Sequence, residues 1–299
     1  MTDYPHLDKN VAKWLSEPDE LRIEYIRKTR WITYSRAKEG LEKLEDLLHY
    51  PKTHRMPNLL LLGNTNNGKT ALAKHFIRQN PAYDNPKGDS IIVPALYIQS
   101  PPKPDEARLY NAILDSVYCP YKRTSHVSEK LSLVIDVCQN INLKMLFIDE
   151  IQNVLAGSTN QQRHFMQVLK YIGNELQIPI VAIGVREALR AIQTEEQLAN
   201  RFEPFALPKW ELNADFVQLL ASFERLLPLK KPSNLASPQL APKLLVMSNG
   251  LLGELSTILQ KAAVFAVKNK IERVDESVLN DIDWVAPDER RKMAERVIR

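Results

Sequence analysis

Residues 58–70 combine an apolar run with the residue types of a phosphate-binding loop. Four leucines precede Gly63, and the chain then follows the spacing Gly63-x4-Gly68-Lys69-Thr70. In nucleotide hydrolases this pattern joins a buried strand to a helix, whose N-terminus and loop N–H groups surround phosphate oxygens. We expect Lys69 to reach the β- and γ-phosphates and Thr70 to hold Mg²⁺.

A second candidate for the same chemistry follows another short apolar run, at residues 144–150. This run ends in two acids, Asp149 and Glu150. A metal-bound nucleotide needs a carboxylate at the tip of a neighbouring strand, so we expect Asp149 to bind Mg²⁺ through its water shell. Glu150 would polarise the attacking water as general base, which favours hydrolysis over binding alone. The residues expected to contact the nucleotide are Gly63, Asn64, Asn66, Asn67, Gly68, Lys69, Thr70, Ala71 and Asp149.

Composition sets the limits for this interpretation. A chain of 299 residues with 44% apolar content can form one sizeable α/β core and a smaller domain. Cys119 and Cys138 lack metal-ligand spacing, so we expect reduced thiols in a cytoplasmic protein. We find neither an apolar run near eighteen residues nor a signal sequence, and therefore expect no membrane partner. The net charge of +4 permits nucleic-acid binding without requiring it.

The elements that must position these residues alternate between strands and helices. Besides the two strands already described, strands are expected at 91–100 and at 178–184. Pro94 favours an edge position or a late entry into pairing for the first of these. The expected helices between them are 105–117, 127–139 and 161–176. This alternation predicts an α/β fold with a parallel sheet sandwiched by helices.

We expect three regions along the chain. Residues 1–50 show helical periodicity without strand signals and are expected to form an N-terminal helical extension packed on the core. Residues 51–208 would form the nucleotide-binding domain, and residues 209–299 a small all-α lid. Lid helices are expected at 216–227, 238–248, 254–269 and 276–282.

The phosphate loop, the acid-tipped strand and the helical region after them together resemble AAA+ P-loop NTPases. The residue patterns of four segments are more specific and resemble those of the TniB family of transposition ATPases, relatives of TnsC. These segments are 22–37, with the pattern Arg-x-x-Tyr-Ile-Arg-x-x-Arg-Trp-Ile-x-Tyr, then 55–60, 63–70 and the Gly-Leu-Leu-Gly-Glu-Leu turn at 250–255. The likeness runs from about residue 20 to 270.

The resemblance implies an ATP-dependent, DNA-binding regulator of transposition that uses ATP and Mg²⁺. Such proteins assemble with copies of themselves into rings or helical filaments on duplex DNA. They link a target selector of the TniQ or TnsD type to a DDE transposase of the TniA or TnsB type; participation of a CRISPR effector stays open. Hydrolysis disassembles the filament. The implied location is the bacterial cytoplasm, on the nucleoid when DNA is bound.

The resemblance also implies a shared catalytic site. AAA+ nucleotides lie between subunits, and a neighbour donates an arginine finger. Arg201 matches the finger position, while Arg186 and Arg190 compete for the role. Val185 follows the strand where many relatives carry a polar residue, and the 253–254 pair Gly-Glu replaces a phosphate-contacting arginine. These departures suggest slow turnover that serves as a switch.

Candidate DNA contacts lie in two basic loops. Lys103 occupies one, and Lys122, Arg123 and Thr124 the other. Contacts to the backbone would make binding sequence-independent and salt-sensitive. Two alternatives remain open from the sequence: a replication or repair loader of the AAA+ class, and a nucleotide-dependent protein adaptor without DNA contact.

Overall fold

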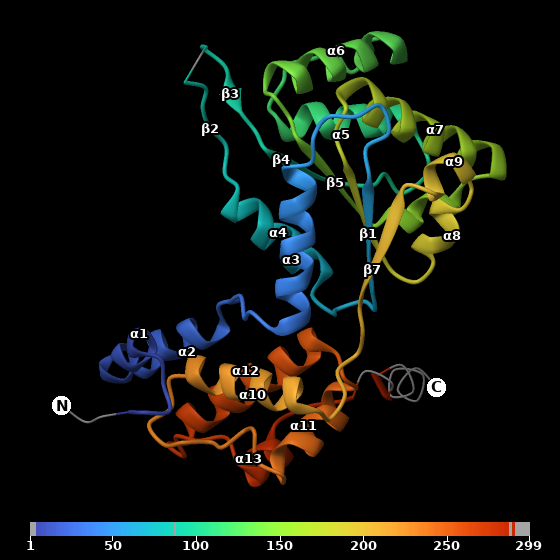
Figure 1. The fold of residues 1–299 in the computed structure, drawn as a ribbon. Coiled ribbons are helices and arrows are strands. Elements are labelled where there is room, and N and C mark those ends of the chain that lie inside the picture. Colours follow the sequence, from blue (N-terminus) through green and yellow to red (C-terminus); the bar gives the residue numbers. More distant parts are fainter. Residues whose placement is uncertain (1–3, 87, 287–288, 291–299) are drawn as a thin grey trace. The chain divides into compact units, whose positions relative to one another are not determined.

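The computed structural model describes residues 4–86, 88–286 and 289–290, and the chain divides into two units. One unit is Arg36–Leu207, and the other joins Met1–Ser35 to Pro208–Arg299. Figure 1 shows both units, which we describe separately. The division falls between Leu207 and Pro208.

The unit Arg36–Leu207 contains the predicted parallel sheet. Its five strands lie in the order β4-β5-β6-β1-β7, and every pairing is parallel. The strands are β1 (Asn58–Gly63), β4 (Ala95–Gln99), β5 (Met145–Asp149), β6 (Ile180–Gly184) and β7 (Phe202–Leu207). The expected α/β class is therefore confirmed. Strand β7 was not predicted, because Pro204 and Glu203 interrupt its apolar pattern; an edge strand tolerates such a proline.

The strand expected over residues 91–100 enters the large sheet late, at Ala95, and its first residues pair elsewhere. Residues 91–92 form β3 (Ile91–Ile92), which pairs antiparallel with β2 (Tyr83–Asp84) in a separate two-stranded sheet. Pro94 lies between β3 and β4, because a residue without an N–H cannot continue the ladder. Strand β4 is an edge strand of the large sheet, as Pro94 suggested.

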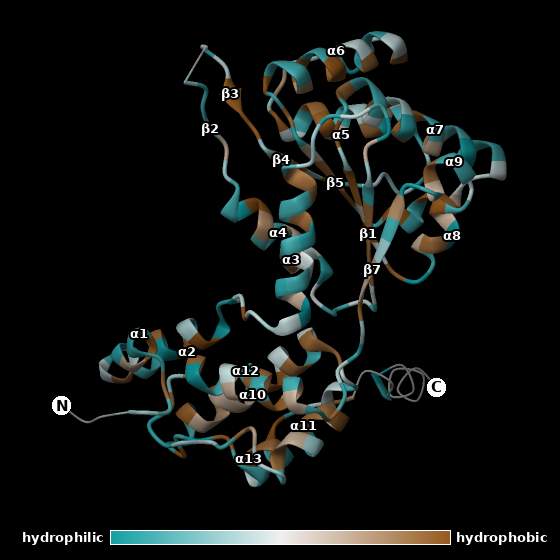
Figure 2. Cartoon of the chain, viewed as in Figure 1, coloured by the Kyte–Doolittle hydropathy of each residue, from teal (hydrophilic) through white to brown (hydrophobic). Residues whose placement is uncertain are grey.

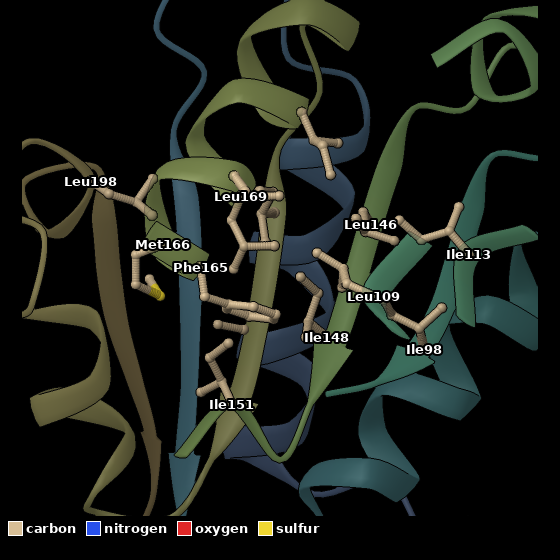
Figure 3. Packing of buried hydrophobic residues seen from close by; sticks show 14 of the residues in the cluster. Ile98, Leu109, Ile113, Leu146, Ile148, Ile151, Phe165, Met166, Leu169 and Leu198 are labelled. Carbon is tan, nitrogen blue, oxygen red and sulfur yellow. The ribbon is translucent and has the colours of Figure 1, made fainter. Parts of the chain in front are cut away.

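Alternating side chains bury both faces of the large sheet. Leu60, Ile148 and Ala182 share one core cluster with helices on one face. Those helices are α5 (Glu106–Ser116), α6 (Val127–Asn140), the 3-10 helix η2 (Ile151–Ala156), α7 (Thr159–Leu176), α8 (Ala188–Ile192) and α9 (Glu196–Ala199). Figure 3 shows Phe165, Met166 and Leu169 of α7 over the sheet. This packing gives α7 its buried stripe.

The opposite face is covered by α3 (Ser35–Leu48) and α4 (Lys69–Gln79). Phe76 of α4 packs on Phe147 of β5, with ring centroids 5.8 Å apart. On α3, a Cβ at Gly40 would lie 2.9 Å from the Phe205 ring, so only glycine allows this close approach. The sheet is thus sandwiched, and Figure 2 shows hydrophobic strands beside helices of mixed hydropathy.

The other unit is helical. It contains α1 (Lys9–Ala12), the 3-10 helix η1 (Lys13–Ser16), α2 (Asp19–Arg27), α10 (Ala214–Leu226), α11 (Leu240–Ser248), α12 (Leu252–Lys268) and α13 (Glu276–Asp281). Ile26 of α2 shares a core cluster with residues of α10 to α13. The expected extension over 1–50 is therefore divided: its first helices complete the helical unit, whereas α3 belongs to the sheet unit.

Within the described ranges, no single helix is long and apolar enough to span a membrane. Helices α11 and α12 pass that test only together, as a pair bent by 118°.

Candidate nucleotide-binding site

The loop after β1 has the backbone geometry of a phosphate cradle. Gly68 adopts φ +88° at the N-cap of α4, a conformation that side chains disfavour, and Asn66 is also left-handed with φ 62°. A Cβ at Gly63 would lie 3.1 Å from the carbonyl oxygen of Leu207. The two glycines therefore serve different needs: Gly63 permits a close approach to β7, and Gly68 permits the turn into the helix.

The Lys69 ammonium lies inside this loop. Its Nζ donates hydrogen bonds to the carbonyl oxygens of Gly63 and Asn64, each at 2.9 Å. The residue is only 7% exposed. Burial lowers the pKa of Lys69 below its ordinary value, against the opposing influence of Asp149 and Glu150. A phosphate would offer this buried cation stronger acceptors than two neutral carbonyls.

Thr70 and Asp149 meet across the sheet edge, although they are far apart in sequence. Thr70 Oγ1 donates a 2.6 Å hydrogen bond to Asp149 Oδ2, and the Tyr97 hydroxyl donates a second bond of 2.6 Å to the same oxygen. The backbone N–H of Glu150 donates to Asp149 Oδ1 at 2.8 Å. Burial, then the bond to Asp149, raises the pKa of Tyr97, which keeps the phenol protonated as a donor.

These oxygens are the donor set that Mg²⁺ prefers. A hydroxyl and a carboxylate can supply a few positions of an octahedral site that water and phosphate complete. Among the described residues, no group of three or more Asp, Glu, His or Cys side chains is placed so that it could hold a metal ion by itself. The residues fit a cation that arrives with a nucleotide, held by Thr70 and Asp149.

Glu150 occupies the tip of β5 in an uncommon conformation. Its φ of 58° and ψ of 38° lie in the left-handed region at the N-cap of η2. The Gln152 side-chain amide donates a hydrogen bond to Glu150 Oε2. Glu150 thus follows Asp149 directly, but its carboxylate has a different partner.

The other residues that were predicted to contact the nucleotide differ in the exposure of their side chains. Asn64 and Ala71 are exposed, whereas Asn67 is buried and donates its side-chain N–H to Leu207 O at 2.9 Å. This bond ties the loop to the end of β7. Asn67 therefore offers a nucleotide its backbone rather than its amide.

Arg201 lies at the amino-terminal ends of the parallel strands, whereas the phosphate loop lies at their carboxyl ends. The strands β1 and β7 are parallel, with Asn58 beside Phe202 at one end and Gly63 beside Leu207 at the other. Arg201 precedes β7 and lines a cavity of about 490 Å³ with Arg55. Its Nη1 donates to Asn174 Oδ1 at 2.8 Å, and burial, then the charge of Arg55, lowers its pKa. No ion pair to a carboxylate is found for either arginine in the described part of the chain.

The two other candidates for the arginine finger lie at different places in the sheet unit. Arg186 follows β6, at the carboxyl edge of the sheet, and Arg190 is an exposed residue of α8. At the other departure from the AAA+ pattern, Glu254 is buried in α12 and forms a salt bridge with Arg290 at 2.5 Å.

The candidate DNA contacts are exposed. Lys103 follows β4, while Lys122, Arg123 and Thr124 belong to the loop between α5 and α6. Lys130 Nζ donates to Arg123 O at 2.8 Å, which supports that loop from α6. The two sets are therefore presented by different loops.

Three residues near these sites escaped the sequence analysis: Tyr97, Gln152 and Arg55. Tyr97 reads as an ordinary strand residue, and Gln152 and Arg55 as ordinary surface residues. Only the proximity of Gln152 to the acid pair offered a signal.

A parallel sheet between helices, a phosphate loop after β1 and an acid-tipped β5 define a AAA+ P-loop ATPase fold. Solved structures agree. The ORC2 protein of Aeropyrum pernix matches with a TM-score of 0.60 at 14% identity, over 86% of this chain and 70% of that one. Cdc6p from Pyrobaculum aerophilum gives 0.59 at 16% identity, over 84% and 67%. Drosophila ORC bound to DNA gives 0.55 at 16% identity, over 94% and 67%.

The family is settled by a different comparison. The model described as "Bacterial TniB protein" matches residues 22–212, and the chain therefore belongs to the TniB family. Comparison with curated proteins gives no match. The match begins within α2 of the helical unit and includes the whole sheet unit.

Proposed function

We propose that this chain hydrolyses ATP slowly and uses the reaction as a switch. The observation that supports this most is the meeting of Lys69, Thr70, Asp149 and Glu150 at the carboxyl edge of one sheet. Lys69 would leave its loop carbonyls for the phosphates, and Glu150 would take a proton from the attacking water. When bound, Mg²⁺ would neutralise phosphate charge at Thr70 and Asp149.

We further propose that ATP controls assembly on duplex DNA during transposition. Membership of the TniB family supports a role in transposition. The exposed cations in two loops support contacts to phosphates rather than bases. Arg201 supports self-assembly, because its distance from the phosphate loop of its own chain leaves a second copy as the natural source of a nucleotide phosphate.

The proposed partners follow from the same family. They are a DDE transposase of the TniA or TnsB type and a target selector of the TniQ or TnsD type. The proposed location is the bacterial cytoplasm, with the protein on the nucleoid when it binds DNA.

The experiment combines electron microscopy with a phosphate-release assay on the purified chain. Duplex DNA is supplied with ATP, with a slowly hydrolysed analogue or with no nucleotide. We expect rings or filaments only with DNA and a triphosphate together, and their loss as ATP is consumed.

Two variants separate binding from turnover. Lys69→Ala should lose nucleotide binding and assembly, whereas Glu150→Gln should keep both and form long-lived assemblies, with turnover lowered by about 10²- to 10⁴-fold. Nucleotide binding without DNA-dependent assembly would favour the adaptor alternative. Full assembly by Lys69→Ala would contradict the proposed switch.

A further inference from the structure

The Gln152 side chain bridges the tips of two neighbouring strands. Its Nε2 donates to Glu150 Oε2 at the end of β5, and its Oε1 accepts a 3.4 Å hydrogen bond from the backbone N–H of Val185, just after β6. Strands β5 and β6 pair in parallel, so both tips lie at the carboxyl edge. Gln152 is half-buried on η2.

This bridge requires an amide. A carboxylate accepts hydrogen bonds and a backbone N–H donates one, so the bridging group must donate at one end and accept at the other. Glutamine alone among side chains of this length satisfies both. A glutamate at position 152 would place a second negative charge beside Glu150.

Gly184, the last residue of β6, leaves the space that the Gln152 side chain occupies. A Cβ at this position would collide with Gln152 Oε1, and it would lie 2.7 Å from the Cβ of Ala188. Only glycine leaves room for the amide beside the strand tip. The position after the strand is Val185, whose side chain cannot hydrogen-bond to a phosphate or a water. Gln152 places a side-chain amide at this strand tip.

We propose that Gln152 is a positioning residue for Glu150, and that Gly184 makes its position possible. Glu150 adopts a left-handed backbone, a conformation that is unfavourable for a residue with a Cβ and needs support from its surroundings. The bridge fixes one carboxylate oxygen to β6, and so directs the general base relative to the tip of the next strand. This inference rests on the proposed ATPase activity.

The test is a double-mutant cycle on the full-length chain with Gln152→Leu and Gly184→Ala. Each change removes or displaces the amide. We expect kcat for ATP hydrolysis to fall by about 10- to 100-fold in each single variant, because small misplacements of a catalytic group cost factors of this size. KM and the affinity for a slowly hydrolysed analogue should stay within about twofold, because neither change touches the phosphate loop.

The coupling between the two kcat losses distinguishes a positioning role from general damage to the fold. The double variant should be no slower than the slower single variant, because both changes break one bridge. Gln152→Glu should be as slow as Gln152→Leu. Gln162→Leu is the matched control: its Nε2 donates only to the backbone oxygens of Gly157 and Leu155, so kcat should not change.

The outcomes are separable from those of the proposed function. Turnover by the wild-type chain with equal or higher kcat in Gln152→Leu would overturn the positioning role and leave the ATPase intact. Multiplicative losses in the double variant would also overturn it. If the wild-type chain binds ATP without turnover, with or without DNA, both proposals fail.

Discussion

The guanidinium of Arg22 forms a two-point ion pair with the carboxylate of Glu272. Arg22 Nη1 lies 3.0 Å from Oε1, and Nη2 lies 2.6 Å from Oε2. Arg22 is 1% exposed and Nη2 also donates to Pro228 O at 2.8 Å. This buried pair joins the first helices of the chain to the loop after α12, and so closes a unit built from both ends of the sequence.

Removing one member of this pair should destabilise the helical unit. In Arg22→Met the buried Glu272 carboxylate would lose its two-point partner and keep only the half-exposed Lys230 ammonium, 3.9 Å from Oε1. We expect a loss of about 3–5 kcal/mol. All four tryptophans belong to this unit, at positions 14, 31, 210 and 284, so their fluorescence during urea unfolding reports on it directly.

Two further variants test the cause. Arg22→Met combined with Glu272→Met should regain much of the loss, because no buried charge is left alone. Lys28→Met breaks an exposed ion pair with Glu24 and should leave the midpoint of urea unfolding nearly unchanged. Equal effects of Arg22→Met and Lys28→Met would contradict the assignment.

The same pair predicts a loss of stability in acid. Burial alone would raise the pKa of Glu272, but the bonds to Arg22, together with the Lys230 N–H, hold it below its ordinary value of 4.5. A carboxyl whose pKa is lowered by folding contributes stability above its unfolded pKa and loses it as pH falls through the folded pKa. Tryptophan-detected stability should therefore decline below about pH 4.5, and the decline should be shallower in Glu272→Gln.

Tyr97 should tune the metal requirement. Its hydroxyl and Thr70 share one oxygen of Asp149, so Tyr97→Phe removes a donor that orients the carboxylate. We expect the Mg²⁺ concentration for half-maximal hydrolysis to rise by roughly fivefold, which corresponds to the loss of about 1 kcal/mol for one hydrogen bond. Binding of Mn²⁺ in the presence of ADP, followed by electron paramagnetic resonance, should weaken in parallel.

Tyr121→Phe provides the control, because Tyr121 also donates to an aspartate, Asp115, at 3.0 Å, but on a loop outside the site. Its metal requirement should match the wild type. An unchanged requirement in Tyr97→Phe would show that Asp149 is held without the phenol.

Arg201 should act on a neighbour's nucleotide. It precedes a six-residue strand whose far end adjoins the phosphate loop, a separation of roughly 20 Å at about 3.3 Å per residue. Arg201→Ala should lower turnover on the order of 10³-fold. Mixing it with inactive Glu150→Gln should restore activity, because mixed contacts pair an intact Glu150 with an intact Arg201.

The same mixing test compares the alternatives. Arg186→Ala and Arg190→Ala should keep their turnover when Arg201 is the finger. Arg55→Ala tests whether Arg55, the second arginine that lines the cavity, contributes to turnover. A lack of recovery in the Arg201→Ala mixture would mean that Arg201 acts within its own chain or only on structure.

The two basic loops should govern the salt dependence of DNA binding. Each lost phosphate contact lowers the slope of log affinity against log salt by about 0.9. Lys122→Glu with Arg123→Glu should therefore reduce the slope by about 2, and Lys103→Glu by about 1, in anisotropy titrations with duplex DNA. Lys38→Glu changes an exposed lysine of α3 and should leave the slope unaltered. Unaltered slopes in the loop variants would move DNA binding to another surface.

Local patterns in the sequence predicted the residues of the candidate nucleotide site. The Gly63 to Thr70 spacing and the acids after β5 could be found because a loop and its flanking elements occupy contiguous residues. The α/β alternation followed from hydrophobic periodicity for the same reason. The helices α5, α6, α7 and α10 to α13 lie within a few residues of their predicted bounds, whereas α8 and α9 were not predicted.

Only the tertiary structure decided relationships between residues distant in the chain. The assignment of the first helices to the helical unit depends on Arg22 meeting Glu272, and the edge strand β7 depends on pairing with β1 in spite of Pro204. Tyr97 and Gln152 gain their roles from strand register and from the space that Gly184 leaves. A linear sequence carries the types of these side chains, but their partners are fixed by packing in three dimensions.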